Sequence, residues 1–431
     1  MFGLVLQARS GLVAVSKLGH KAQMDYQLPT SRADAVVLDL KDPLASARNN
    51  FCLPKGLNYL DGHSLGPSTQ SALDAVNRAA RDEWTNGLIR SWNEADWINL
   101  PKTVGAKLAG LIGAQAEDVI VCDSVSVNLY KLAAAALNLV STKRVMVEAD
   151  EFPTDQYMAK GLSELTGAEF VRLESGTAHS ALPFGGVLLK SVVNYRTAVV
   201  EDIAGLERIA RETGTLIIWD LSHATGCVDL NLARDGARLA TGCTYKYVNG
   251  GPGAPAFIYA AKDIADQLRN PLSGWFGHAD PFAFDPDYRP VDGAARFAAG
   301  TPGVLSLKAL EGALAVFNDV SVDQLSAKAR ALGDVCLWWG DRLGLDPISP
   351  GIGERRGGHV SLLHADGYAV VQALIARNII PDFRAPDAMR FGFSPLYVRF
   401  VDVWDAMEQL EDILKTRAWD QPQFKVKATV T

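Results

Sequence analysis

Short apolar segments alternate with helical patterns of about ten residues or more through most of this chain, and this alternation constrains its fold more than any other feature. Strands are expected at 118–122, 144–148, 186–193, 215–220 and 254–260. Helices are expected between them at 124–139, 155–165 and 201–213. Because parallel neighbouring strands need a long crossover connection, usually a helix, the pattern predicts an α/β fold with a mostly parallel sheet covered by helices on both faces.

The pattern changes after residue 301, which indicates a second structural unit. A long helical stretch at 306–342 is followed by a Gly- and Pro-rich segment and then by strand, helix, strand and helix. We therefore expect an N-terminal extension at 1–25, a large α/β domain at 26–305 and a smaller α+β domain at 306–431. The extension has no acidic residue before Asp25, as in some transit peptides, but we expect it to be a flexible terminus.

Composition narrows the class of function. The 431 residues carry 42 Lys and Arg against 49 Asp and Glu, a net charge of −7, with no cluster of basic residues. Nucleic acid is therefore not an expected partner. No apolar stretch approaches the roughly 20 residues of a membrane span. The five cysteines form no CxxC pair and the histidines are dispersed, so we expect reduced thiols, a cytoplasmic location, no metal site and a small-molecule ligand.

Two segments at predicted strand ends contain the candidate catalytic residues. Asp220 ends one strand, and Lys246 lies in a nearly uncharged, Gly-rich and aromatic stretch at 241–253. Either residue alone is more often a solvated charge. Ligands of parallel sheets bind beyond the carboxyl ends of the strands, where desolvation would lower the pKa of Lys246 and leave a nucleophilic amine. A lysine together with a carboxylate for a pyridinium nitrogen is what a pyridoxal phosphate (PLP) site requires.

Two further segments fit the same site. Residues 122–126 end a strand and open a helix, so hydroxyls and free backbone N–H groups could hold a phosphate, although serine there could simply cap the helix. Residues 151–155 follow the next strand and include Phe152, which could stack on a planar ring or belong to the core. Each signal is modest alone, but together and in this order they favour a PLP site.

Motifs along the chain from about residue 51 resemble those of the kynureninase family. They are YLDGHSLG at 59–66, GLIRSWN at 87–93, FPTD at 152–155, VNY at 193–195, WDLSH at 219–223, GCTYKY at 242–247 with NGGPG at 249–253, LSGWFGH at 272–278 and MRFGFSPLY at 389–397. The resemblance implies a PLP-dependent transferase type I fold, that of aspartate aminotransferase, with a seven-stranded type of sheet. It also implies hydrolysis of L-kynurenine to anthranilate and L-alanine, and a homodimer with its active site at the interface.

The resemblance also assigns roles to residues. Lys246 would form the internal aldimine, Asp220 would pair with the pyridine nitrogen and Phe152 would stack on the ring. The phosphate would be held by Ser124, the amide of Val125, Tyr245, Trp275 and Thr301, the last two contributed across the dimer interface. The cofactor shell would be completed by Asp155, Ser191 and His223. Arg390 would bind the substrate carboxylate, and Tyr245 would also donate a proton.

Some positions depart from the family pattern. His63 replaces an Asn, Val192 replaces a His and Ala198 replaces a Gly, and of these His63 and Val192 are expected to influence substrate choice. Trp92 favours L-kynurenine, and 3-hydroxy-L-kynurenine is the alternative substrate. Another type I PLP enzyme, such as a cysteine desulfurase or an aminotransferase, is a second interpretation. A PLP-binding regulator is a third, but the segment before residue 50 is too short and too weakly charged to be a DNA-binding module.

Overall fold

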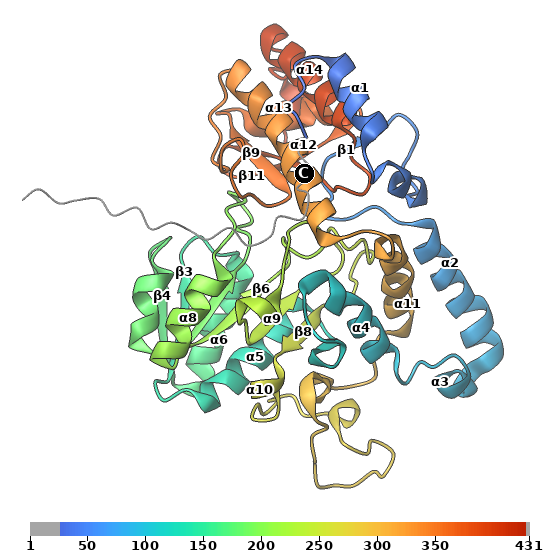
Figure 1. The fold of residues 1–431 in the computed structure, drawn as a ribbon, viewed down its shortest axis with the longest axis vertical. Coiled ribbons are helices and arrows are strands. Elements are labelled where there is room, and N and C mark those ends of the chain that lie inside the picture. Colours follow the sequence, from blue (N-terminus) through green and yellow to red (C-terminus); the bar gives the residue numbers. More distant parts are fainter. Residues whose placement is uncertain (1–25, 428–431) are drawn as a thin grey trace, which may run out of the picture.

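The computed structural model describes residues 26–427 and has two lobes, a larger one around a central sheet and a smaller one above it in Figure 1. The predicted extension at 1–25 lies outside the described residues. The central sheet has seven strands in the order β2-β8-β7-β6-β5-β3-β4. Their bounds are β2 Val119–Val121, β3 Arg144–Glu148, β4 Glu169–Leu173, β5 Val187–Ser191, β6 Leu216–Asp220, β7 Leu239–Gly242 and β8 Phe257–Ala260.

The prediction of a mostly parallel sheet is confirmed. Strands β3 to β7 pair in parallel, and only β8 runs antiparallel to its neighbours β7 and β2. The sequence pattern did not predict β4 or β7. Strand β4 is partly exposed at the sheet edge and β7 has only four residues, so neither produces a long apolar segment.

The sheet is covered on both faces, since every position of the central strands β5 to β8 is buried. In β6, Ile217 and Trp219 belong to one core cluster, whereas Leu216 and Ile218 belong to the other. This follows from the two-residue period of a strand. The first cluster includes α4 (Leu100–Ile112) and α8 (Ile203–Thr213), and the second includes α5 (Val125–Leu139) and α6 (Pro153–Thr166).

The smaller lobe is built on an antiparallel sheet in the order β11-β12-β9. Its elements are β9 His359–Leu363, β11 Asp382–Arg384, β12 Ala388–Gly392, α12 Val322–Arg342, α13 Gly367–Ile375 and α14 Phe400–Thr416. The predicted helical stretch at 306–342 is divided into α11 (Val304–Ala313), a short 3-10 turn and α12. The division falls at Ser321, whose side chain forms a capping box with Gln324 and so starts a new helix.

The N-terminal segment packs on the smaller lobe, although it is distant in sequence. Helix α1 (Arg32–Lys41) lies beside α14 in Figure 1, and the Tyr26 and Phe400 rings are 5.2 Å apart. Strand β1 (Asn58–Tyr59) pairs in parallel with β10 (Ile379–Ile380). The polypeptide then enters the larger lobe through α2 (Gln70–Arg78). The division of the chain near residue 305 stays a prediction.

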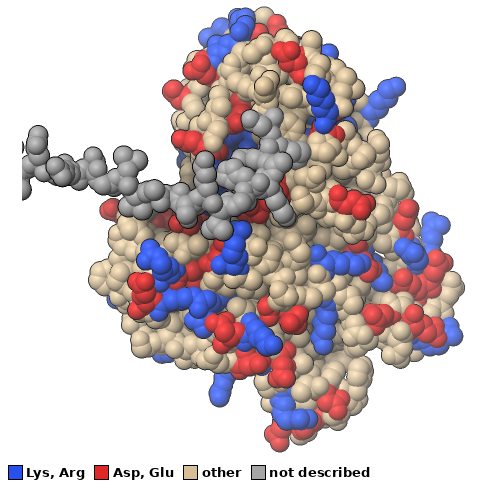
Figure 2. Space-filling view, in the orientation of Figure 1, with Lys and Arg blue, Asp and Glu red and all other residues tan. Residues whose placement is uncertain are grey.

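The surface carries charges of both signs. On the face shown in Figure 2, Lys and Arg side chains are interspersed with Asp and Glu. Within residues 26–427, no helix has both the length and the apolar character needed to cross a membrane.

Candidate functional site

A cavity of about 260 Å³ lies at the carboxyl ends of the central strands. Strands β5 and β6 end there, at Ser191 and Asp220. The sequence-predicted residues that line this cavity are His63, Val125, Phe152, Asp155, Ser191, Asp220, His223, Tyr245, Lys246 and Arg390. Residues far apart in the chain therefore meet at the carboxyl ends of the strands, where a parallel α/β fold binds its ligands.

Lys246 lies in the loop that follows β7, and its side-chain nitrogen faces His223. The Lys246 Nζ and the His223 Nε2 are 2.8 Å apart. The loop is fixed by a turn from the N-terminal segment, since the Gly66 amide donates to the Tyr245 carbonyl over 2.7 Å. A Cβ at Gly66 would lie only 2.2 Å from the Lys246 carbonyl oxygen, so this approach requires glycine.

Two buried carboxylates lie beside the lysine. Asp220 accepts a hydrogen bond from the Ser222 amide over 2.8 Å, and Asp155 lies in the first turn of α6. Burial raises the pKa of both carboxyls. For Asp155 the negative charges of Asp220 and Glu151 raise the pKa further, and its Oδ2 has no hydrogen-bond partner among the described residues. The pair therefore retains capacity to bind a donor within the cavity.

The N-terminus of α5 contributes donors to the cavity. Val125 and Ser126, in the first turn of the helix, line the cavity wall. Ser124 is the N-cap and its Oγ accepts a hydrogen bond from the Val127 amide over 3.4 Å, so it plays the capping role and does not line the cavity. The first backbone N–H groups of a helix have no intrahelical acceptor and favour an anion such as a phosphate.

The opposite wall comes from the smaller lobe and centres on Arg390. This residue of β12 is almost fully buried. Its guanidinium group donates to Asp382 of β11 and to the Tyr195 carbonyl. Asp382 also accepts from Ser64 Oγ over 2.8 Å and pairs with Arg384 at 2.7 Å. The carboxylate of Asp382 therefore holds two arginines that line the same cavity.

Three buried histidines meet beside these walls. His63 stacks on His359 with ring centroids 5.2 Å apart and an interplanar angle of 12°, and His223 lies 5.6 Å from His359. Burial lowers the pKa of all three imidazoles, and the nearby Arg390 or Lys246 lowers it further. They are therefore neutral near pH 7. His359 does not line the cavity and was not expected from the sequence.

Besides Ser124, three predicted site residues lie outside the cavity. Trp92, Trp275 and Thr301 do not line it, and Thr301 is exposed on the surface. Trp92 and Trp275 both contact Phe276, with ring centroids 5.9 Å and 4.5 Å away. One chain therefore does not bring them to its own Lys246.

Several cavity residues were not among the predicted site residues. They are Ser64, Ser126, Thr154, Val193, Tyr195, Ser222 and Arg384. All but Arg384 lie within or next to the sequence motifs, so the motifs could have indicated them. Arg384 had no such signal, because its place depends on the pairing of β11 with β12.

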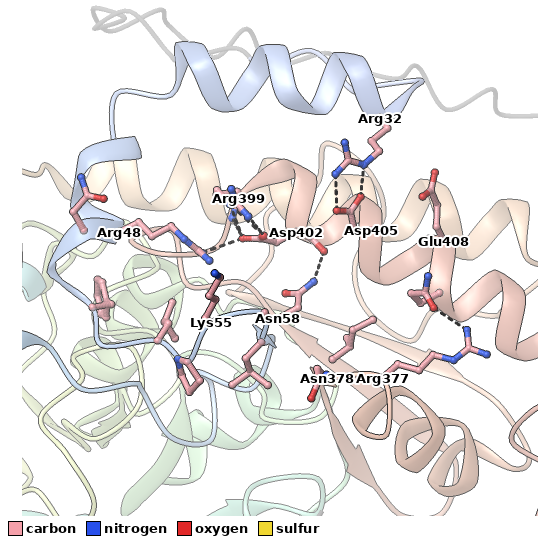
Figure 3. Close-up of a pocket in the computed structure, with 18 residues that line it drawn as sticks. Arg32, Arg48, Lys55, Asn58, Arg377, Asn378, Arg399, Asp402, Asp405 and Glu408 are labelled. Atoms are coloured by element: carbon pink, nitrogen blue, oxygen red, sulfur yellow. Dashed lines mark hydrogen bonds and ion pairs between the residues drawn. The ribbon is translucent and has the colours of Figure 1, made fainter.

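A larger cavity of about 860 Å³ lies apart from the sheet edge, near α1 and α14 (Figure 3). Its arginines already have carboxylate partners: Arg32 binds Asp405, and Arg48 and Arg399 both bind Asp402. Lys246, Tyr245 and Phe152 do not line this larger cavity. We therefore take the smaller cavity as the candidate active site.

Comparisons with known proteins agree with this geometry. Residues 325–410 match the family model of the kynureninase C-terminal domain. The chain is 42% identical to the kynureninase of Pseudomonas fluorescens over 93% of its own length and all of that protein. It is also similar in structure to a cysteine desulfurase from Thermococcus onnurineus NA1, with a TM-score of 0.74 at 16% identity, over 86% of this chain and 98% of that one. This second likeness shows the fold, that of PLP-dependent type I enzymes, whereas identity along the full sequence shows that the chain belongs to the kynureninase family.

Proposed function

We propose that the cavity around Lys246 is the active site in which this chain, a PLP-dependent hydrolase of the kynureninase family, cleaves the Cβ–Cγ bond of L-kynurenine to give anthranilate and L-alanine. One observation carries the proposal. Lys246, Asp220 and the N-terminus of α5 line one side of the cavity, and the buried Arg390 lines the same cavity from the smaller lobe. Residues suited to hold a cofactor and a residue suited to bind a carboxylate thus line one cavity.

The residues present fit PLP. Asp220 and Asp155 are buried carboxyl groups that can face a ring nitrogen, and Asp155 Oδ2 has no other partner among the described residues. The first turn of α5 and the Tyr245 hydroxyl would hold the phosphate, and Phe152 and His223 would flank the ring, with Ser191 nearby. When bound, PLP supplies an electron sink next to the substrate's α-carbon.

The protein groups position the substrate and move protons. Arg390 would bind the α-carboxylate, a task that suits a planar guanidinium. The Nζ of Lys246 would then carry the proton removed from the α-carbon, with His223 holding the amine in place. Burial raises the pKa of Tyr245, so its phenol stays protonated and can serve as a proton donor in the later steps.

A substrate comparison tests this function. PLP-loaded protein is mixed with L-kynurenine or with 3-hydroxy-L-kynurenine, and aromatic-product fluorescence and alanine release are followed. We expect alanine release from both compounds, with the higher kcat/KM for L-kynurenine, the preference that the family resemblance attaches to a tryptophan at position 92. A PLP-containing protein that releases alanine from neither compound would contradict the proposal. A higher kcat/KM for the 3-hydroxy compound would overturn only the assigned preference.

We also propose that the enzyme is a homodimer whose interface includes an exposed aromatic ridge. The ridge consists of Trp92, Phe276, Trp275, Phe282 and Phe284, whose neighbouring rings are 4.5 to 6.4 Å apart. It continues along the loop that projects from the lower edge of Figure 1, and Phe284 is 80% exposed. An apolar surface of this kind favours burial against another protein. Trp275, on this ridge, and the nearby Thr301 could then reach the partner's cavity.

Mixing two inactive variants would test the dimer. Lys246→Ala and Trp275→Ala chains are each purified, mixed, and dissociated and reassociated together. If Trp275 serves the partner's cavity, a mixed dimer has one complete site, so random reassortment would restore about a quarter of the wild-type activity. Activity that stays at the sum of the two variants would show that Trp275 acts within its own chain or not at all.

We further propose a cytoplasmic location. All five cysteines are free, as thiols are in a reducing compartment. Cell fractionation with an antibody against the protein would test this, and recovery in an exported or organelle fraction would contradict it.

A further inference from the structure

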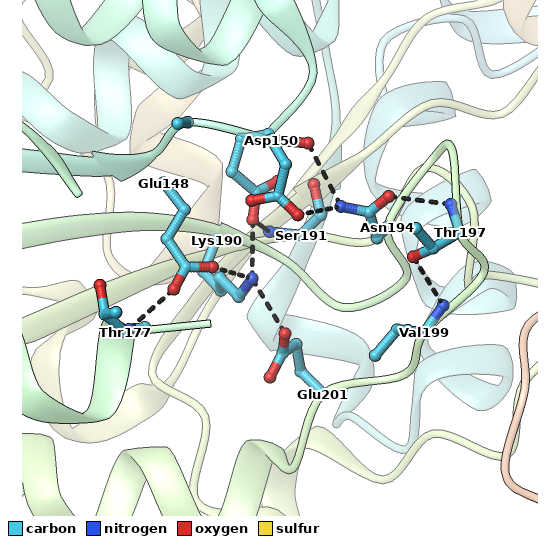
Figure 4. Close-up of polar contacts among 12 residues, drawn as sticks. Glu148, Asp150, Thr177, Lys190, Ser191, Asn194, Thr197, Val199 and Glu201 are labelled. Carbon is cyan, nitrogen blue, oxygen red and sulfur yellow. Dashed lines mark hydrogen bonds and ion pairs between the residues drawn. The ribbon is translucent and has the colours of Figure 1, made fainter. Parts of the chain in front are cut away.

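The buried ionic cluster in Figure 4 adjoins Ser191, a residue that lines the cavity. At its centre is Lys190 of β5, whose side chain is only 4% exposed. Its Nζ lies 2.6 Å from Glu148, 3.0 Å from Glu151 and 2.9 Å from Glu201. One ammonium group thus binds three carboxylates, and such a buried group is retained only where the geometry satisfies it.

The cluster is joined to the cavity at two points. Lys190 immediately precedes Ser191, which lines the cavity. Glu151 accepts a hydrogen bond from the Ser191 amide over 3.1 Å and begins the segment that carries Phe152, Thr154 and Asp155 into the cavity wall. Movement of Lys190 or Glu151 would therefore shift the residues of the cavity wall, Ser191 on one side and Phe152 and Asp155 on the other.

Hydrogen bonds also hold the turn at 149–155, among them one from the Ala149 amide to the Leu173 carbonyl over 2.9 Å. Asn194 donates to the Asp150 carboxylate over 3.0 Å, and Gln156 donates to the Glu151 carbonyl over 2.9 Å. Phe152 is 42% exposed and contacts the Tyr195 ring edge-on, so it is not anchored by a core. The carboxylate of Glu151 ties this turn to β5, because it pairs with Lys190 and accepts a hydrogen bond from the Ser191 amide.

We propose that Lys190 is a positioning residue for the cofactor site: by binding Glu148, Glu151 and Glu201 together, it fixes the turn at 149–155 against β5 and so places Phe152 and Asp155 in the cavity wall. This inference rests on the proposed function, because it assumes that PLP occupies the cavity. Glu151 adds an electrostatic link. Its negative charge, with that of Asp220, raises the pKa of Asp155, whereas the positive charge of Lys246 lowers it.

The first experiment measures PLP affinity of the full-length protein after cofactor removal and reconstitution. Lys190→Met keeps the length of the side chain and removes its charge, and Lys190→Arg restores the charge. The matched control is Lys328→Met, since Lys328 is equally buried and its Nζ lies 2.7 Å from Asp42, away from the cavity. Thermal unfolding of each PLP-free variant reports the loss of stability separately from affinity.

We expect Lys190→Met to bind PLP about tenfold more weakly, because a charge-assisted contact that orients the wall is lost. Lys190→Arg should regain most of the affinity, and Lys328→Met should lose stability but keep wild-type affinity. Equal losses of affinity in Lys190→Met and Lys328→Met would overturn the positioning role. Absence of PLP binding by the wild-type protein would instead overturn the proposed function.

A second variant keeps the inference testable if Lys190→Met does not fold. Glu151→Gln preserves the oxygen that accepts from Ser191 and leaves Lys190 with Glu148 and Glu201. It removes one of the two negative charges that raise the Asp155 pKa, so the pH profile of PLP affinity should shift to lower pH. A profile that coincides with the wild type would show that the cluster does not act on Asp155.

Discussion

The two walls of the cavity are built in different ways. The wall from the larger lobe is made of residues at strand ends or helix starts, such as Ser191, Asp220 and Val125, and the sheet topology places them. The wall from the smaller lobe depends on ion pairs. There Asp382 holds Arg384 and Arg390, and no strand end of the central sheet is involved.

This difference predicts how each wall responds to a side-chain substitution. A strand end is fixed by many backbone hydrogen bonds and by the core on both faces, so a single side-chain substitution leaves its position intact. A buried guanidinium depends on the few groups that pair with it, and removal of one partner leaves an uncompensated charge. We therefore expect substitutions at the strand ends of the first wall to act through lost chemistry. Substitutions that break ion pairs, in the second wall or at the turn held by Lys190, should act through lost placement.

The largest effect is expected in the larger-lobe wall. Lys246→Ala should lower kcat by a factor of about 10³ or more without unfolding the protein, because the amine that moves the proton is lost. Steady-state alanine release and the Tm of each variant are measured. Lys160→Ala, at an exposed lysine of α6, is the control and should behave as the wild type. Near-normal turnover in Lys246→Ala would show that the lysine of the first wall takes no part in the reaction.

Arg390→Ala tests the smaller-lobe wall. It should raise KM for kynurenine by about 30- to 100-fold with a smaller change in kcat, because a charged hydrogen-bonding partner of the carboxylate is removed. Initial rates over a range of substrate concentrations separate the two constants. An unchanged KM would contradict a role in carboxylate binding and would leave Arg390 as a structural partner of Asp382.

Asp382→Asn tests placement alone. It removes the charge of the carboxylate that positions Arg384 and Arg390, but it keeps both arginines. We expect a rise in KM of about tenfold, smaller than that for Arg390→Ala, because Arg390 keeps its bond to the Tyr195 carbonyl. The matched substitution Asp387→Asn affects a half-exposed carboxylate paired with Arg196 and should leave KM unchanged. Equal KM values in Asp382→Asn and wild type would show that the guanidinium does not need this carboxylate.

The smallest effect concerns stability of the PLP-free protein. The pKa of Asp155 is raised in the folded state, so the folded protein binds this proton more tightly than the unfolded chain. That contribution is complete below the ordinary pKa of an aspartate and is lost as pH rises through the raised value. Asp155→Asn should therefore raise Tm by roughly one to two degrees at neutral pH and by less at acidic pH. A difference in Tm that is independent of pH would contradict this.

The sequence indicated much of the first wall and little of the second. Asp220, Lys246 and the segments at 122–126 and 151–155 could be predicted because strand ends follow from hydrophobic patterning. The kynureninase motifs added Arg390 and His63, but not the reason for their positions. Asp382, Arg384 and His359 were missed because their importance comes from the pairing of β11, β12 and β9, and short strands in an antiparallel sheet leave no distinctive pattern.

By itself, the sequence determined the α/β class, the mostly parallel sheet and the order of the chemical residues along it, because alternation and crossover length are local properties. Tertiary structure alone decided which distant residues share a buried space. It brought the Gly66 turn against Lys246, paired Arg390 with Asp382 and placed Lys190 among three glutamates. It also kept Trp275 outside its own chain's cavity. The physical reason is that burial and ion pairing depend on contacts between distant segments, which a local sequence pattern does not encode.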